Sequence, residues 1–365
     1  MRIAIRELLR RPGRFLPVGR ALTPLVVLLI VLGGFLDGLA LDSTGGFRAQ
    51  GERRLWVLAD VAELQLARSL VDPDTAAAVS AVEGVVEVGG LGVVTTTASP
   101  ETTGELIDVA VFGYERAGAR LPPPPGAGAA IVDDRLQVRS DVQVGDTIEV
   151  GPGRTPVRVT ALADDVTQSA PTLWVAPETW REIAADADPG ATVPPGAFQS
   201  LVVTPSDGAD PDVLGGRIDA ATTTTQTVDL DGLIAGQPVI AQQTAAFSGI
   251  IGVTFVVTLL VVALFFALLT LERLQLYAVL KAVGASSGDL VRGVAVQALG
   301  ISIGALAAGG LAAAAIVALL PADLPVRLEP RRLAAIAAGT VVTAVIGALL
   351  TLRRILAIDP AESIG

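Results

Sequence analysis

Residues 247–270 read FSGIIGVTFVVTLLVVALFFALLT, and this run contains no charged side chain. About 20 consecutive apolar residues are enough for a helix to cross the hydrocarbon core of a bilayer. The stretch therefore predicts a membrane-spanning helix, which we place at residues 246–271. The composition agrees with this interpretation, because 51% of the 365 residues are hydrophobic and the mean hydropathy is +0.61.

Three further blocks have the length and the composition of membrane spans. One lies near the N-terminus, and the other two follow the opening stretch towards the C-terminus. The predicted spans are residues 21–42, 292–320 and 333–353, in addition to the first one described. A short outer loop, residues 321–332, would join the last two spans.

The first 20 residues contain six arginines and a single acid, Glu7. Arginine-rich flanks remain on the cytoplasmic side of a membrane, so residues 1–20 are predicted to form a cytoplasmic amphipathic helix beside anionic lipid. A cleaved signal peptide is the alternative, but the apolar core is long and no A-x-A site follows it. The sequence predicts a multi-pass protein of a bacterial cell membrane. With four spans, both termini are expected in the cytoplasm, and residues 354–365 are predicted to form the cytoplasmic tail.

Residues 43–245 have a different character, with 12 arginines, 28 acids and several Pro/Gly breaks. The segments TIEV and PVRVTAL, separated by GPGR, predict a pair of strands. VEGVVEVGGLGVVTTT (82–97) predicts strands bounded by turns, TLWVAPETW a strand and a helix start, and DPDT the start of another helix. The predicted fold is an α-helical membrane protein with four transmembrane helices plus an α+β extracytoplasmic domain inserted between helices 1 and 2.

The chain contains no cysteine and no histidine. This excludes disulfides, thiolate nucleophiles, Cys/His zinc sites and histidine acid–base chemistry. The adjacent carboxylates Asp133/Asp134 and Asp164/Asp165 are expected to lie on a solvated surface. No G-x-x-x-x-G-K-[ST] motif is present. We therefore predict a non-enzymatic chain with no catalytic residue, no metal, no cofactor and no nucleic-acid partner.

The cytoplasmic link between the second and third spans, residues 272–291, has helical character. No glycine or proline interrupts residues 271–283, so the second span is expected to continue as a helix beyond the bilayer. Gly284 can end that helix with a positive φ, and Ser286 with Asp289 has the spacing of a capping box for the next one. A stiff helix followed by a sharp corner suits the transmission of force.

Apolar side chains of this link could fill a groove on a partner, with two cations at the edge. One of the cations is Lys281, the only lysine of the chain. The alternative is an interfacial helix whose charges lie among lipid head groups. The predicted partner-binding residues are Arg273, Leu276, Tyr277, Leu280, Lys281, Val283, Gly284, Ala285 and Ser286.

Two features of the predicted spans are less specific. Gly300 and Gly304 have the small-xxx-small spacing that lets helices pack closely, although a chain so rich in glycine and alanine produces this spacing by chance. Asp37 lies near the outer end of the first span. An acid within a membrane is a functional candidate, but at this position we expect it to be hydrated and not part of a proton relay.

The link and the following span are similar to a segment of the FtsX-like permeases, which include MacB-type and LolCDE-type transporters. The family's L-[KR]-A-[LV]-G-A-[ST] core corresponds to residues 280–286, and its closing PAE box corresponds to residues 360–362. The strand pair of residues 147–162 resembles the MacB-like extracellular core domain, and the N-terminal segment resembles the family's first amphipathic helix. The chain departs from duplicated members in having four spans, and its tail ends soon after the PAE box.

This resemblance implies the permease subunit of an ABC transporter that transmits mechanical movement. Its partners would be a separate cytoplasmic ATPase, which holds ATP and Mg²⁺, and a second copy of itself or a paralogous permease. Export or extraction of lipidic, peptide or lipoprotein-like cargo is the favoured function, with membrane lipid and an extracytoplasmic adaptor or the cargo as further partners. The alternatives are a signalling protein that activates a cell-wall hydrolase and, less favoured, an importer of small solutes.

Overall fold

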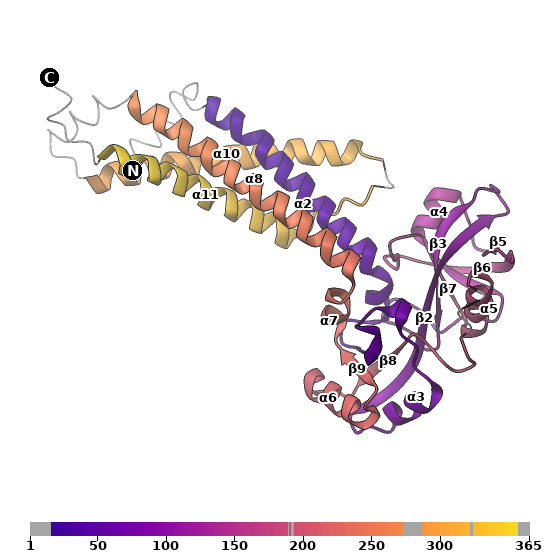
Figure 1. Ribbon diagram of the computed structural model, residues 1–365. Coiled ribbons are helices and arrows are strands. Elements are labelled where there is room, and N and C mark those ends of the chain that lie inside the picture. The colour runs from indigo at the N-terminus through magenta and orange to yellow at the C-terminus, as the bar shows by residue number, and fades with distance from the viewer. Residues whose placement is uncertain (1–15, 189, 191–192, 273–286, 322–323, 357–365) are drawn as a thin grey trace, which may run out of the picture. The chain divides into compact units, whose positions relative to one another are not determined.

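The computed structural model describes residues 16–188, 190, 193–272, 287–321 and 324–356 (Figure 1). The chain divides into two compact units. The helical unit comprises the described residues of Met1–Gly38 and Ala245–Gly365, and the sheet unit comprises Leu39–Thr244. The predicted amphipathic helix at residues 1–20 begins outside the described residues, and most of the predicted tail also lies outside them.

Four long helices build the helical unit. Each contains a stretch that is long and apolar enough to cross a membrane, in agreement with the predicted fold class. In α8, the residues from Ala245 to Phe265 form this stretch. The helices are α2 (Leu16–Gln50), α8 (Pro238–Leu271), α10 (Ser287–Leu319) and α11 (Pro330–Leu356).

Glycines allow these helices to approach each other closely. A Cβ atom on Gly309 of α10 would lie 2.6 Å from Cγ1 of Val26 in α2, and one on Gly339 of α11 would lie 2.9 Å from the ring of Phe255 in α8. Apolar side chains fill the remaining space, including Leu22 and Leu29 of α2, which are buried. The helices therefore pack through small residues at their crossings, as membrane helices commonly do.

Helix α2 continues past residue 42, where the first span was expected to end. The sequence at that point, LDSTGGF, contains two consecutive glycines, and glycine disfavours a helix interior by about 1 kcal/mol relative to alanine. The helix nevertheless runs to Gln50, because its last three turns are held by contacts with the sheet unit that are described below.

The sheet unit contains nine strands in the order β3-β7-β4-β6-β5-β2-β8-β1-β9, with an additional pairing between β3 and β2. Most neighbours are antiparallel, whereas β3–β7 and β4–β6 are parallel. The strands are β1 (Leu55–Ala59), β2 (Val85–Pro100), β3 (Ile107–Tyr114), β4 (Ala129–Asp133), β5 (Thr147–Val150), β6 (Thr155–Ala163), β7 (Thr172–Val175), β8 (Ser200–Pro205) and β9 (Thr225–Val228).

Seven short helical segments connect these strands. Asp72 caps α3, since its carboxylate accepts a hydrogen bond from the Thr75 amide at 2.7 Å, and this bond lowers the pKa of Asp72. The predicted helix after DPDT is thereby confirmed. The segments are η2 (Asp60–Ala62), η3 (Leu66–Arg68), α3 (Pro73–Ser80), α4 (Asp134–Ser140), α5 (Pro177–Ala187), α6 (Pro211–Thr222) and α7 (Leu230–Ala235).

The β3–β2 pairing closes six strands into a barrel. Its members are β2, β3, β7, β4, β6 and β5, and the β5–β6 pair is the predicted hairpin, with Val150 opposite Thr155. Valine, isoleucine and leucine side chains fill the barrel, and Trp180 of α5 packs against them. The barrel is therefore a packed core and not a channel.

The remaining strands form a second substructure. Strands β2, β8, β1 and β9 pair antiparallel, and α3 and α6 pack together against them (Figure 1). In chain order these elements read β-α-β-β-α-β, a common supersecondary unit, and most of the barrel is inserted between its second and third strands. Strand β1 is buried on both faces, with Leu55 and Val57 facing the helices and Trp56 and Leu58 facing the opposite core.

The prediction of strands bounded by turns within residues 82–97 holds for the turn at residues 82–84 and was wrong for the later glycines. Strand β2 runs without interruption for 16 residues and contains three glycines, at positions 89, 90 and 92. Aromatic rings occupy the space where their side chains would lie. A Cβ atom would lie 2.1 Å from the Phe198 ring at Gly90 and 2.0 Å from the Trp180 ring at Gly92. Glycine in a strand commonly marks such a close approach.

We predict that Gly92→Ala destabilises the sheet unit by about 1–3 kcal/mol, because the added methyl group overlaps the Trp180 ring. Gly126→Ala is the matched control, since no atom lies within 4 Å of its added Cβ. Urea unfolding of the full-length protein in mild detergent can be followed by tryptophan fluorescence, because all three tryptophans lie in the sheet unit. Equal unfolding midpoints for the two variants would contradict the prediction.

Candidate functional site

The predicted partner-binding residues, Arg273 to Ser286, lie outside the described residues. Helix α8 is described up to its last turn, where the Glu272 amide donates to the Leu268 carbonyl at 3.0 Å. Helix α10 begins at Ser287, directly after the serine that the sequence predicts as its cap. The coupling role of this segment stays a prediction.

The two glycines predicted for helix packing lie in α10. No atom of the described residues lies within 4 Å of a Cβ added to Gly304, whereas Gly309 of the same helix lies directly against α2. Within the described residues of this one chain, α10 therefore approaches α2 closely at Gly309. Close helix packing through Gly300 and Gly304 stays a prediction.

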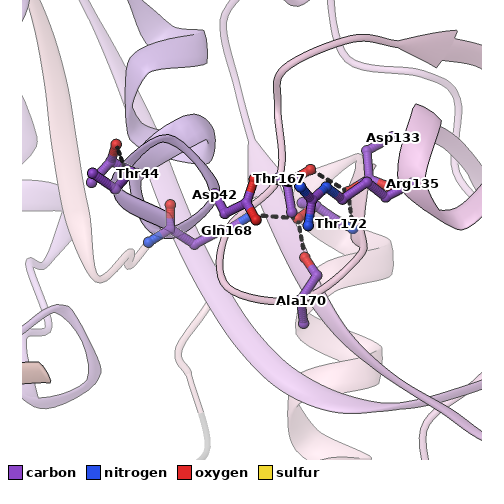
Figure 2. A network of polar contacts seen from close by, with 9 residues as sticks. Asp42, Thr44, Asp133, Arg135, Thr167, Gln168, Ala170 and Thr172 are labelled. Carbon is purple, nitrogen blue, oxygen red and sulfur yellow. Dashed lines mark hydrogen bonds and ion pairs between the residues drawn. The ribbon is translucent and has the colours of Figure 1, made fainter. Parts of the chain in front are cut away.

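The end of α2 is held by a loop between β6 and β7, residues 164–171. Gln168 Nε2 donates a hydrogen bond to the Ser43 carbonyl at 2.6 Å, and the Ser169 amide donates to the Asp42 carbonyl at 2.7 Å. The Gly46 amide donates in return to the Thr167 carbonyl at 3.0 Å. We call this set of contacts the helix anchor (Figure 2).

The glycine pair of α2 makes the anchor possible. A Cβ atom on Gly45 would lie 2.6 Å from the Thr167 carbonyl oxygen, and one on Gly46 would lie 3.0 Å from the Phe112 ring. The next residue, Phe47, is buried and makes edge-on contacts with Trp56 and Phe112. A glycine pair that looks like a helix end in the sequence is therefore a docking surface.

An ion pair adds a side-chain contact to the anchor. Arg135, in the first turn of α4, lies with its Nη2 atom 2.7 Å from Oδ1 of Asp42. The Asp42 side chain is only 12% exposed, so water screens this pair less than it screens a surface pair. The contact connects α2 to α4 as well as to the loop.

Asp133 organises the loop that grips α2. It is the last residue of β4, the strand between β6 and β7, and its side chain is fully buried. Its Oδ1 accepts from the Leu136 amide at 2.9 Å, which caps α4, and its Oδ2 accepts from the Thr172 amide at 2.6 Å and Thr167 Oγ1 at 3.1 Å. One carboxylate thus connects the middle of this loop, at Thr167, to the start of β7, at Thr172 (Figure 2).

The prediction that Asp133 is a solvated surface residue was therefore wrong. Burial raises its pKa to about 6, against the effect of its three hydrogen-bond donors. The neighbouring Asp134 is partly exposed, and burial together with Asp164 and Asp165 raises its pKa. The sequence carries a signal for the capping role, since Asp133 lies directly before a helix, but its loop partners are 34 and 39 residues away.

The start of α8 is also attached to the sheet unit. Gln237, directly before α8, donates from Nε2 to the Leu64 carbonyl at 2.7 Å. Gly236 lies so close to Leu64 that an added Cβ would be 2.5 Å from that side chain, and Leu233 of α7 is fully buried. Both polypeptide connections between the two units thus begin or end in packed, hydrogen-bonded structure.

Asp37 is not simply hydrated, contrary to the sequence prediction. Its Oδ1 lies 2.5 Å from Nε of Arg332, and its side chain is only 13% exposed. Arg332 lies 295 residues further along the chain, in the first turn of α11.

Within the described part of the chain, no group of three or more acidic residues could hold a metal ion.

The described structure has four helices that are long and apolar enough to cross a membrane, with a folded sheet unit between the first two. Residues 248–360 match the family described as FtsX-like permease C-terminal. The chain is 25% identical over 355 residues to the ABC transporter permease Rv0072 of Mycobacterium tuberculosis, which covers 93% of this chain and 95% of that protein. It is also 25% identical over 353 residues to the permease Mb2592 of Mycobacterium bovis, with the same coverage. Residues 248–360 thus match an FtsX-like permease domain, and the chain is similar over nearly its whole length to ABC transporter permeases.

Two solved structures are similar to about half of the chain. The periplasmic region of MacB from Actinobacillus actinomycetemcomitans is 14% identical and covers 51% of this chain and 92% of that structure, with a TM-score of 0.36. The extracellular domain of the noncanonic ABC-type transporter YknZ from Gram-positive bacteria is 12% identical and covers 48% of this chain and 100% of that structure, with a TM-score of 0.35.

We predict that the sheet unit becomes more stable as the pH falls from about 7 to 5. The pKa of Asp133 is about 6 in the folded state, above the ordinary 3.8, so the folded state binds the proton more tightly. The stabilisation is complete below the unfolded value and is lost as the pH rises through 6. Urea unfolding of the full chain at several pH values, followed by tryptophan fluorescence, measures this effect.

Two variants separate Asp133 from the other acids. Asp133→Asn should reduce the pH dependence, and it should also lower the stability by about 1–3 kcal/mol, because its amide group faces the Thr172 amide donor. Asp108→Asn, at an exposed position of β3, should retain the wild-type dependence. An unchanged pH dependence in Asp133→Asn would refute the assignment.

Proposed function

We propose that this permease transmits movement from a separate cytoplasmic ATPase to its sheet unit outside the membrane. ABC transporter permeases as a class act with a cytoplasmic ATPase, and the similarity of this chain to such permeases supports the same arrangement here. The observation that carries the proposal is that both connections between the two units are helices, α2 and α8. A helix transmits displacement along its axis, since each turn is braced by backbone hydrogen bonds.

The ATPase would bind the cytoplasmic link of residues 272–291. The link joins two spans, α8 and α10, so its movement would displace both helices together. Its apolar side chains, Leu276, Tyr277, Leu280 and Val283, suit a groove on the partner, and buried apolar anchors dominate the binding energy of such interfaces. The cations Arg273 and Lys281 would lie at the rim of this groove.

The helix anchor would deliver the movement to the sheet unit. Three hydrogen bonds, two of them between backbone groups and one from the Gln168 side chain, hold the end of α2 together with the Asp42–Arg135 ion pair, each contributing on the order of 1 kcal/mol. Displacing α2 without the sheet unit would break all of these contacts together. The anchor therefore favours movement of the sheet unit as a body over bending of the connection.

The charge distribution supports an outer location for the sheet unit. Five arginines precede α2 and a sixth, Arg20, lies near its start, whereas residues 43–245 carry 28 acids against 12 arginines. An N-terminus held in the cytoplasm by its arginines places the segment after the first span outside. An even number of spans then returns the C-terminus to the cytoplasm.

The proposed cargo is a lipidic, peptide or lipoprotein-like molecule that is exported or extracted from the membrane. A second copy of the chain or a paralogous permease would complete the transporter. Reconstitution with the ATPase, followed by screening of candidate cargo for stimulation of ATP hydrolysis, tests this assignment. Activation of a cell-wall hydrolase without any cargo response would replace it with a signalling function.

We predict that Tyr277→Glu combined with Leu280→Glu abolishes co-purification of the ATPase, because two charges would enter an apolar interface. Val138→Glu is the control, since this exposed valine of α4 lies outside the link. Retention of the ATPase at the wild-type level by the double variant would rule out the coupling segment.

We predict that Gly45→Leu uncouples the sheet unit from ATP hydrolysis while the ATPase remains bound, because the added side chain displaces Thr167 from α2. Gly216→Leu is the matched control, because it is also a helical glycine but has open space around it. The chain has no cysteine, so an environment-sensitive fluorophore on Val138→Cys reports on the sheet unit alone. A full ATP-dependent fluorescence change in Gly45→Leu would contradict the role of the anchor.

A further inference from the structure

The described residues 325–328 of the α10–α11 connection, which are meant by the connection below, lie on a strip of glycines on α2. A Cβ atom on Gly34 would lie 2.8 Å from Cδ2 of Leu328, and one on Gly38 would lie 2.0 Å from the carbonyl oxygen of Pro325. The Arg327 amide donates a hydrogen bond to the Gly34 carbonyl at 2.9 Å. The connection therefore contacts the backbone of α2 directly, because the glycines of the strip have no side chains to separate the two segments.

An ion pair fastens the end of this connection. Arg332 extends over Gly33, where an added Cβ would lie 2.9 Å from its Cδ atom, and its Nε lies 2.5 Å from Oδ1 of Asp37. The first turn of α11 contains Arg331 and Arg332 but no acid. A helix N-terminus favours negative charge, and Asp37 of α2 adds its carboxylate to that of Glu329, which directly precedes this turn.

The ion pair is only partly satisfied. The second carboxylate oxygen of Asp37, Oδ2, is buried and has no hydrogen-bond partner among the described residues. A buried ion pair contributes little net stability unless its remaining groups are hydrogen-bonded, and apolar residues often replace it without loss. Stability alone therefore gives no reason for this pair.

The place of the pair along α2 points to another role. Asp37 lies five residues before Asp42, with which the helix anchor begins. A smooth glycine surface allows one element to move along another, whereas interlocking side chains resist such movement. The polar contacts described on this surface are the Arg327–Gly34 hydrogen bond and the Asp37–Arg332 ion pair, and Leu328 packs beside them against the apolar cluster of α2. Release would therefore break these two contacts and withdraw the Leu328 side chain from that cluster.

We propose that Asp37 and Arg332, together with Gly33, Gly34 and Gly38, form a latch that holds the α10–α11 connection on α2 in one state of the transport cycle and releases it in another. The proposal rests on the proposed function, because the release would accompany the movement of α2 that the ATPase drives. The latch would set which position of α2 is populated when no nucleotide is bound.

A reversible cross-link tests the release directly. In this cysteine-free chain, the pair Asp37→Cys and Arg332→Cys can be joined by a short bifunctional thiosulfonate reagent in the full complex in lipid nanodiscs. We expect the cross-link to lower the ATP hydrolysis rate of the complex by about tenfold, as expected for a coupled conformational step, and reduction to restore it. The same reagent should not change the ATP hydrolysis rate of either single-cysteine variant.

The rate of cross-linking gives a second measurement. It should fall when Mg-ATP and a trapped ATPase hold the complex in the released state. Full ATP hydrolysis in the cross-linked protein, or equal cross-linking rates in all nucleotide states, would overturn the latch. If the uncross-linked wild-type complex shows no coupled ATP hydrolysis at all, the proposed function fails and not the latch alone.

Exchange of the two charges is a second test that does not depend on correct folding of the double-cysteine variant. Asp37→Arg and Arg332→Asp should each disturb the coupling, because each places like charges together. The double exchange should restore the wild-type rate to within about threefold, since the pair is re-formed in reverse. Failure of the double exchange to improve on either single variant would refute the pairwise interaction.

Discussion

The buried carboxylate of Asp133 is the constraint on which the sheet unit's hold on α2 depends. It lies at the end of β4, and β6 and β7 pair with β4 on its two sides. By accepting hydrogen bonds from Thr167 and Thr172, it ties the β6–β7 loop across the end of the strand between them. The same loop presents its backbone to α2, so the grip on the helix is set by a side chain that does not itself touch α2.

The membrane-spanning part of this architecture could be predicted from the sequence, because length and apolarity alone decide whether a helix can span a bilayer. The strand pair of residues 147–162 could also be predicted, since its turn residues and alternating side chains are local signals. Both features depend on residues that are neighbours in the chain. No tertiary contact was needed to recognise them.

The errors share a physical cause, which is that distant partners change the meaning of local residues. The glycines of β2 resemble turn residues, but the rings that cover Gly90 and Gly92 come from positions 198 and 180. Asp133 resembles one of many surface acids until its loop partners are known. Asp37 finds its counter-charge 295 residues away, a distance over which a single sequence contains no pairing signal.

The closed ring of six strands has a mechanical consequence for the sheet unit. Each strand of the ring is hydrogen-bonded on both sides, so a pull on one strand is shared around the circumference instead of peeling an edge. Among the described strands, the exposed edge is β9, which is four residues long and lies outside the ring. The loop that holds α2 joins β6 and β7, which are both members of the ring. A force applied through this loop is therefore shared among all six strands of the barrel.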